Sequence, residues 1–262
     1  MRWVRFQHQG AVSYGIVEAE DRIEKVEGDL FGEHRRTGNK VAMSEVKLLV
    51  PFEPRTFYAA GLNYKVHVTE AAHMLGKEPD FPPKPDIGYR ANNALIAHDE
   101  NVVIPADATE KVQFEGELVV VVGKTAKHLS EADALSCVFG YTIGNDVSER
   151  TWQRGDRTLW RAKNTDTFKP MGPWIDTDVR LDDLHTTVRV NGKPEVEFAT
   201  NDMLFGVETY IAAMTRYVTL YPGDMIWMGT DGSSPNLKHG DVVEVDIKTL
   251  GTLRNKFVRE GQ

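Results

Sequence analysis

The chain from residue 112 to residue 123 reads Val112-Gln113-Phe114-Glu115-Gly116-Glu117-Leu118-Val119-Val120-Val121-Val122-Gly123. β-Branched residues bounded by glycine are typical of a strand, and the unbroken apolar run indicates burial on both faces. Because alternate residues of a strand share a face, Glu115 and Glu117 should project side by side from its end. Two buried anions need compensation, which a divalent cation would supply. Gly116 lets another group approach the backbone closely.

An exposed strand end with two solvated glutamates is the alternative, and it is the usual meaning of an isolated Glu-x-Glu pattern. The valines that follow and the glycine between the acids favour the buried site. On this segment alone, both interpretations stay open.

The composition is that of an ordinary soluble globular protein, with 262 residues, 41% of them hydrophobic and 27% charged. A net charge of −8 argues against nucleic acid as a main partner, because phosphate binding needs a basic face. No apolar run approaches the length of a membrane span, and residues 1–10 lack the apolar core of a secretion signal. The single cysteine, Cys137, excludes an internal disulfide and suits the cytoplasm, where we expect the protein to act. Its apolar neighbours indicate a packing role.

The first part of the chain differs in pattern from the rest. Residues 2–27 alternate apolar and polar side chains and predict two or three short strands, and a polar stretch with weak order signals follows at 32–39. Pro51 then marks the boundary that we expect between a small N-terminal module, residues 1–51, and a main domain, residues 52–262.

The main domain is predicted to be strand-rich with isolated helices. Helices are expected at 130–138, where Ser130 and Asp133 form a capping box, and at 202–218, where Asp202 is the expected cap. Asn191-Gly192 predicts a hairpin. A late strand is expected at 242–247, and four prolines in 79–85 predict a loop that could act as a lid. Without regular alternation of strands and helices, the fold class is β-rich α+β and not a doubly wound sheet.

A third acid, Asp146, follows an apolar strand and a Gly144-Asn145 turn, and Ser148 then begins an expected helix. Alone, Asp146 would be interpreted as a helix cap. Together with Glu115 and Glu117 it completes a set of three carboxylates. Ligands that offer only oxygen favour Mg²⁺, Mn²⁺ or Ca²⁺ over zinc.

His67 and Glu70 would share a face if they lie on a helix, and a carboxylate that orients an imidazole suits a general base. The alternative is a solvated surface pair. Lys163 could stabilise a developing oxyanion or enolate beside a metal. Its alternative is a surface lysine, and the sequence does not separate the two.

Together these motifs resemble the fumarylacetoacetate hydrolase superfamily, in the right order over roughly residues 55 to 257. The motifs are Gly61-Leu62-Asn63-Tyr64 with His67 and Glu70, Phe114-Glu115-Gly116-Glu117-Leu118, Gly140-Tyr141-Thr142 with Asn145-Asp146, Ser148, Arg150 and Gln153, Lys163 with Asp166-Thr167, Gly172-Pro173-Trp174, Val190-Asn191-Gly192, and Pro222-Gly223-Asp224 to Gly229-Thr230.

The resemblance implies a role for each matching residue. Glu115, Glu117 and Asp146 match the carboxylates that hold one Mg²⁺ or Mn²⁺ per site. His67 and Glu70 match the dyad on a lid helix that activates water. The family fold is a mixed β-sandwich roll, here with a small N-terminal β module, and members are commonly homodimers.

Around the substrate, Lys163 matches the active-site lysine, and Gln153 and Thr230 match positions that contact the bound oxo acid. Arg90 could pair with a second substrate carboxylate, although a surface role is an equal alternative.

The chain departs from the family pattern at positions around the substrate and not at the metal ligands. Thr165 stands where the family has Phe in its Lys-x-Phe-Asp-Thr motif. Asp231 stands for the Pro of the Gly-Thr-Pro-x-Gly loop, and Val66 stands for an Asp that often precedes the lid histidine. These departures leave the substrate's identity open.

The resemblance implies a metal-dependent hydrolase of carbon–carbon bonds in acylpyruvate- or fumarylpyruvate-like 2-oxo acids, in catabolism of aromatic compounds or oxo acids. Isomerisation of hydroxydienedioates or decarboxylation of an oxo acid such as oxaloacetate at the same site is the alternative. A protein that binds metal and oxo acid without turnover ranks lower, because it predicts loss of the acid–base dyad, and His67 and Glu70 are both present.

Overall fold

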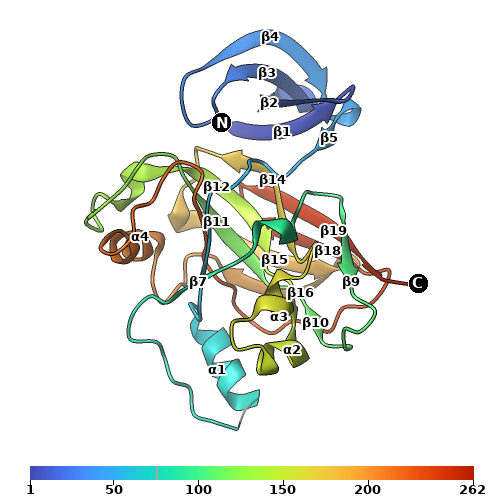
Figure 1. Ribbon diagram of the computed structural model, residues 1–262, viewed down its shortest axis with the longest axis vertical. Coiled ribbons are helices and arrows are strands. Elements are labelled where there is room, and N and C mark those ends of the chain that lie inside the picture. Colours follow the sequence, from blue (N-terminus) through green and yellow to red (C-terminus); the bar gives the residue numbers. More distant parts are fainter. Residues whose placement is uncertain (75) are drawn as a thin grey trace.

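The computed structural model describes residues 1–74 and 76–262. Its larger sheet has the strand order β4-β3-β2-β1-β14-β12-β11-β17-β6-β7, with β5 paired to β1 and β8 to β14, and a second sheet has the order β16-β15-β18-β19-β9. Strands β10 and β13 form a separate pair. The predicted β-rich α+β class is confirmed, and Figure 1 shows α4 at one side of the strands and α1 at the lower end of the molecule.

The strands are β1 Arg2–His8, β2 Ala11–Glu18, β3 Arg22–Gly28, β4 His34–Ala42, β5 Lys47–Leu48, β6 Phe57–Ala60, β7 Ile87–Tyr89, β8 Leu95–Ile96, β9 Asn101–Ile104, β10 Val112–Gln113, β11 Gly116–Val122, β12 Val138–Asn145, β13 Ser148–Glu149, β14 Lys169–Asp176, β15 His185–Val190, β16 Lys193–Ala199, β17 Met225–Trp227, β18 Val242–Ile247 and β19 Gly251–Arg259. The helices are α1 Lys65–Met74, α2 Arg150–Gly155, α3 Trp160–Asn164 and α4 Val207–Thr215, with short 3₁₀ turns at Ala19–Asp21, Met43–Glu45, Asn92–Ala94, Ala134–Cys137 and Leu181–Asp183.

Strand β11 lies inside the larger sheet between β12 and β17, and every one of its residues is buried. One face, which includes Val120, packs with Val188 and Val245 of the second sheet. The other face, which includes Val119, packs with Trp3 of the N-terminal strands. Burial of a valine side chain stabilises a fold by about 1.5–3 kcal/mol. Two opposed cores therefore explain the unbroken valine run, and the predicted burial on both faces is confirmed.

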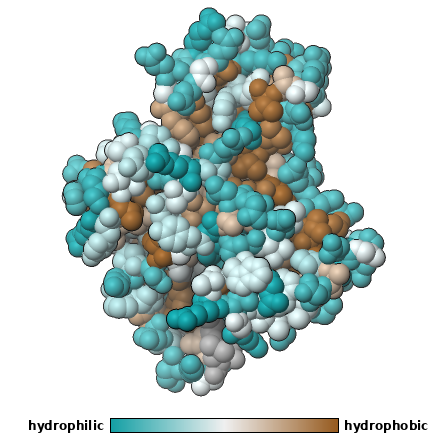
Figure 2. Space-filling model, viewed as in Figure 1, coloured by the Kyte–Doolittle hydropathy of each residue, from teal (hydrophilic) through white to brown (hydrophobic). Residues whose placement is uncertain are grey.

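The N-terminal strands β1 to β4 form an antiparallel meander that joins the larger sheet through β1 and β14, where Trp3 pairs with Ile175. The strands predicted within residues 2–27 are confirmed. Strand β4 was not predicted, because its residues are mostly exposed at the sheet edge and show no alternation. Figure 1 shows this group at one end of the molecule, and Figure 2 shows hydrophobic residues where it meets the main body. A boundary near residue 51 remains a proposal.

Three local predictions need correction. Residues 130–138 do not form an α-helix: a 3₁₀ turn spans Ala134–Cys137, and Val138 already begins β12, where it pairs with Val122 of β11. Helix α4 starts at Val207 with Gly206 as its cap, because the preceding backbone is held in a loop by the bond from the Leu204 amide to the Asn63 carbonyl. Gly144 and Asn145 lie within β12 and not in a turn.

Other local predictions are confirmed. Asn191 and Gly192 join β15 to β16 with φ of 54° and 79°, the left-handed geometry that a two-residue hairpin requires. Strand β18 spans Val242–Ile247, the residues predicted to form a late strand. Cys137 is buried, and burial raises the pKa of its thiol, which suits packing. Within the described residues, no helix has the length and apolar character needed to cross a membrane.

Gly116 is where the second sheet approaches β11. A Cβ added there would lie 2.8 Å from Val188 Cγ2 and 2.9 Å from Val245 Cγ1. Because branched valines cannot move aside cheaply, we predict that Gly116→Ala lowers the free energy of unfolding by about 1–3 kcal/mol, measured by urea denaturation. Gly155→Ala is the control, since that glycine ends α2 in open space and should lose no stability. Equal stability of both variants would contradict this account of the sheet contact.

Candidate metal centre

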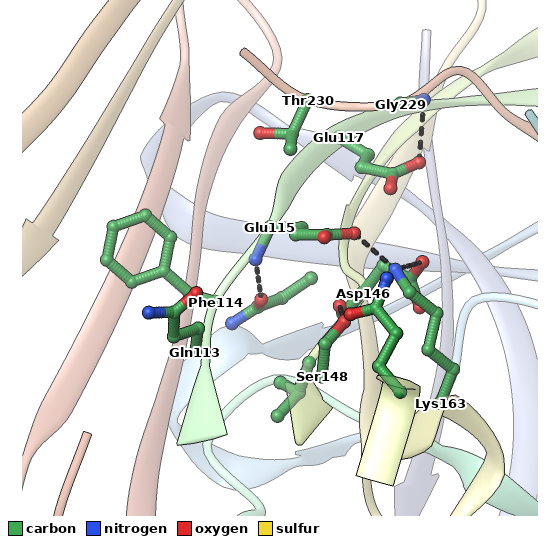
Figure 3. A network of polar contacts seen from close by, with 12 residues as sticks. Gln113, Phe114, Glu115, Glu117, Asp146, Ser148, Lys163, Gly229 and Thr230 are labelled. Carbon is green, nitrogen blue, oxygen red and sulfur yellow. Dashed lines mark hydrogen bonds and ion pairs between the residues drawn. The ribbon is translucent and has the colours of Figure 1, made fainter. Parts of the chain in front are cut away.

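The three predicted carboxylates meet at one end of the β11–β12 pair. Glu115 directly precedes β11, Glu117 lies on it, and Asp146 directly follows β12. Each offers an oxygen, all within 4.8 Å of one another, and the residues are 5%, 3% and 1% exposed. The buried interpretation of Glu-x-Glu is therefore the correct one, and Figure 3 shows the three side chains converging.

Backbone bonds fix this convergence. Gly116 pairs with Asn145, so the end of β11 lies against the end of β12. The Asp146 amide donates to the Glu115 carbonyl at 2.8 Å, and the Glu115 amide donates to Asn145 Oδ1 at 3.0 Å. Asp146 is not a helix cap, because β13 follows and Glu149 caps α2 by accepting from the Trp152 amide.

Lys163 lies among the carboxylates and not on the surface. Helix α3 buries its side chain, and Nζ lies 2.5 Å from Glu115 Oε2 and 2.7 Å from Asp146 Oδ2. The structure thus brings Lys163 together with two of the three predicted ligands, as Figure 3 shows.

Two further cations hold Asp146. Arg90 binds its carboxylate with two nitrogens, at 3.0 Å and 3.3 Å, and Lys169 Nζ lies 2.7 Å from Oδ1. Burial raises the pKa of Asp146, but the charges of Arg90, Lys163 and Lys169 outweigh it, so this pKa lies well below its usual value. Burial lowers the pKa of Lys169 to about 8.

Lys169 was not among the predicted site residues. The available signal was a lysine at the start of an otherwise apolar segment, between Phe168 and Pro170. Arg90 was predicted either to pair with a substrate carboxylate or to have a surface role. Its side chain is 7% exposed and its guanidinium binds Asp146, so the surface role is wrong, and contact with substrate remains a prediction.

Arg150 is the second positively charged side chain that pairs with Glu115, after Lys163. Its Nη1 lies 2.7 Å from Glu115 Oε1 and donates to Gln153 Oε1 at 2.9 Å. Burial raises the pKa of Glu115, and the charges of Lys163 and Arg150 more than reverse this, so the pKa is lowered. Gln153 therefore reaches the site through Arg150, and its contact with substrate remains a prediction.

Glu117 differs from the other two acids. Within residues 1–74 and 76–262, the hydrogen bond recorded for its side chain comes from the Gly229 amide at 2.8 Å, and no ion pair is recorded. Burial, with the charges of Asp146 and Glu115, raises the pKa of Glu117 to about 8. Thr230, which is 7% exposed, follows Gly229 and lies beside Glu117 in Figure 3.

This donor set fits a divalent cation. It consists of carboxylate oxygens, which suit Mg²⁺ or Mn²⁺. One carboxylate, Glu117, is buried without an ion pair among the described side chains, and a bound cation would supply positive charge beside it. Glu115, Glu117 and Asp146 would hold the ion.

His67 and Glu70 lie on α1, near the loop that continues from Gly229. His67 Nδ1 lies 3.1 Å from the Gly232 carbonyl oxygen, and Glu70 accepts a hydrogen bond from the Ser233 hydroxyl. His67 lies close enough to Glu115 that a proton on its ring would help to lower the pKa of that acid, after the effects of burial, Lys163, Arg150 and Asp146. No bond between His67 and Glu70 is recorded in the described chain, so Gly232 orients the imidazole here.

Comparison with known proteins identifies the family. Residues 56–258 match the model described as fumarylacetoacetate (FAA) hydrolase C-terminal, and residues 1–51 match the model described as Rv2993c-like, N-terminal. The chain belongs to the fumarylacetoacetate hydrolase family.

Proteins similar to this chain include one named as a hydrolase and one named as an isomerase. Protein Rv2993c of Mycobacterium tuberculosis is 37% identical over 235 residues, covering 88% of this chain and 86% of the relative. The 2,4-didehydro-3-deoxy-L-rhamnonate hydrolase of a Sphingomonas species is 34% identical, and the match covers 98% of this chain and 95% of the relative. The structure of 2-hydroxyhepta-2,4-diene-1,7-dioate isomerase from Mycobacterium marinum aligns with a TM-score of 0.89 at 34% identity, over 100% of both chains. The predicted fold is confirmed, while the reaction is not determined by the family.

The pKa of Glu117 predicts a pH-dependent stability without metal. Because this pKa is about 8 in the folded protein against 4.5 ordinarily, the folded state keeps a proton that the unfolded state releases. The free energy of unfolding should therefore fall as pH rises from about 4.5 to about 8. Glu117→Gln should flatten this fall and weaken Mn²⁺ binding by at least about tenfold.

Urea denaturation with chelator across this pH range, and calorimetric titration with Mn²⁺, measure the two effects. Glu110→Gln is the control, since Glu110 has a side chain that is 84% exposed. If Glu117→Gln kept the wild-type pH slope and Mn²⁺ affinity, Glu117 would be neither the unpaired acid nor a ligand.

Proposed function

We propose that the protein is a divalent-metal-dependent hydrolase of carbon–carbon bonds in acylpyruvate- or fumarylpyruvate-like 2-oxo acids, acting in catabolism of aromatic compounds or oxo acids. The observation that carries this proposal is the contact between His67 Nδ1 and the Gly232 carbonyl oxygen, beside the carboxylate site. A carbonyl oxygen only accepts hydrogen bonds, so the Nδ1 that contacts Gly232 carries the ring proton. In the neutral imidazole, Nε2 then has the free lone pair that a base toward water requires.

A bound Mg²⁺ or Mn²⁺ would supply Lewis-acid polarisation of the substrate's oxygens. His67 takes a proton from water, and the water oxygen attacks the carbonyl distant from the carboxylate. The carbon–carbon bond breaks, and its electron pair goes to the pyruvate enolate. Lys163 stabilises the enolate charge, and return of the proton to carbon gives pyruvate and a carboxylic acid.

The charge of the site supports an anionic substrate. Arg90, Arg150, Lys163 and Lys169 surround three carboxylates, and a divalent cation would add further positive charge. Although the whole chain carries −8, the local balance attracts a carboxylate. In this arrangement Thr230 and Gln153 would contact the oxo acid. Thr230 follows Gly229, which binds Glu117. Gln153 binds Arg150, which pairs with Glu115.

The second candidate is isomerisation or decarboxylation at the same site. It is favoured by the isomerase from Mycobacterium marinum, which matches the full chain. Both reactions pass through an enolate and need no activated water, so Lys163 would serve them equally. A non-catalytic metal-binding protein ranks lowest, because His67, Glu70 and Lys163 are all present. A homodimer and a cytoplasmic location remain proposals.

We predict that His67→Ala lowers kcat by at least about 100-fold while Mn²⁺ affinity stays unchanged, because a general base contributes about 10²–10⁴ in rate. His73→Ala is the matched control: this exposed histidine lies on the same helix and should leave turnover intact. Acylpyruvates, fumarylpyruvate, oxaloacetate and a 2-hydroxydienedioate would be assayed with Mn²⁺ or Mg²⁺, and products identified by mass spectrometry.

Metal-dependent release of pyruvate and an acid is the expected outcome. Loss of carbon dioxide, or a product of unchanged mass, would transfer the assignment to the second candidate. Full activity of His67→Ala would refute the role given to His67.

A further inference from the structure

The loop formed by residues 229–233 contacts both the carboxylate site and helix α1. At its start, the Gly229 amide donates to Glu117 Oε2 at 2.8 Å. At its end, the Ser233 hydroxyl donates to Glu70 of α1. Between them, Asp231 Oδ1 accepts from the His67 amide at 2.8 Å. This loop therefore connects a candidate metal ligand to the helix that carries the candidate base.

Helix α1 has little to stabilise it on its own. It spans ten residues, its first turn holds no acidic residue, and Val66, Val68 and Thr69 are β-branched. The first amides of a helix have no partner within it. Asn63, just before the helix, uses its side chain elsewhere, on Phe205 and Met228.

Asp231 supplies a hydrogen-bond acceptor for the first turn of α1. It reaches across 164 positions of sequence to accept the hydrogen bond of a first-turn amide, and it is 8% exposed. Its negative charge also complements the positive end of the helix dipole. Asp231 thus attaches the loop to the first turn of the helix.

The same contact orients the imidazole of His67. The His67 amide is held by Asp231, and the ring Nδ1 is held by the next residue, Gly232, at 3.1 Å. The backbone of His67 is therefore attached to Asp231, and its ring to the next loop residue, Gly232. If the hydrogen bond from the His67 amide to Asp231 is lost, α1 can move away from the loop, and the imidazole ring moves with it.

We propose that Asp231 is a positioning residue, which holds α1 against the loop of residues 229–233 so that His67 stays beside the carboxylate site. The inference rests on the proposed function only in that His67 is taken as the base. Asp231 does not touch substrate in this role, and it acts through His67.

Hydrogen exchange of the α1 amides, with metal-loaded full-length protein, tests the inference without any assay of activity. Loss of a helix-capping acceptor corresponds to about five- to tenfold more frequent opening, so Asp231→Ala should raise exchange across α1 by about that factor. Asp231→Asn keeps an acceptor oxygen and should restore most of the protection. Ser233→Ala, which removes the contact with Glu70, should give a smaller rise in exchange.

Kinetics and metal binding complete the test. Asp231→Ala should lower kcat by a smaller factor than it raises exchange, with little change in KM, because α1 stays closed for most of the time. Mn²⁺ affinity should stay within about twofold of wild type. Asp182→Ala is the control, because this exposed acid pairs with Arg180 and should not alter exchange in α1.

Unchanged α1 exchange in Asp231→Ala would overturn the inference even if the wild type is an active hydrolase. A wild type inactive on every substrate would instead count against the proposed function, while the exchange result would still decide whether Asp231 holds α1. Loss of Mn²⁺ affinity in Asp231→Ala would also overturn the inference, because it would place Asp231 in the metal site itself.

Discussion

Antiparallel pairing of β11 with β12 is the contact on which the rest of the site depends. The hydrogen bond from the Asp146 amide to the Glu115 carbonyl joins the two strand ends, and period-two geometry then places Glu117 on the same side. The second sheet can close over this point because Gly116 has no side chain. The N-terminal strands cover the opposite face of β11. Two cores thus fix a pair of strand ends that carry three acids.

Burial of these acids is offset unevenly. Asp146 and Glu115 are each held by positive side chains, whereas Glu117 has a backbone amide alone among the contacts recorded for it. A partly compensated cluster of this kind has a built-in preference for one more positive charge. The cations that balance Asp146 and Glu115 also leave the site attractive to an anionic acid. The proposed binding of metal and the proposed binding of substrate therefore rest on the same electrostatic arrangement.

Local pattern was sufficient to predict the parts of the fold that depend on neighbours in sequence. The burial of β11, the shared face of Glu115 and Glu117 and the hairpin at Asn191 follow from alternation, valine content and turn chemistry. The pattern failed where pairing partners decide the outcome: Val138 lies in a strand because β11 pairs with it, and β4 exists because β3 presents an edge. Lys169 could not be assigned, because its contact with Asp146 requires β14 and β12 to be neighbours. Asp231 is separated from His67 by 164 positions, and only the folded chain reveals the contact.

Crystals grown with Mn²⁺ and measured at the manganese absorption edge would test the central claim most directly. The account predicts one anomalous peak per chain, within about 2.0–2.4 Å of oxygens from Glu115, Glu117 and Asp146, with the Lys163 ammonium still in contact with the carboxylates. No peak among these oxygens at saturating Mn²⁺, with Glu117 still bonded only to Gly229, would contradict it. In that case the surrounding cations alone would balance the buried acids, and the site would not be a metal centre.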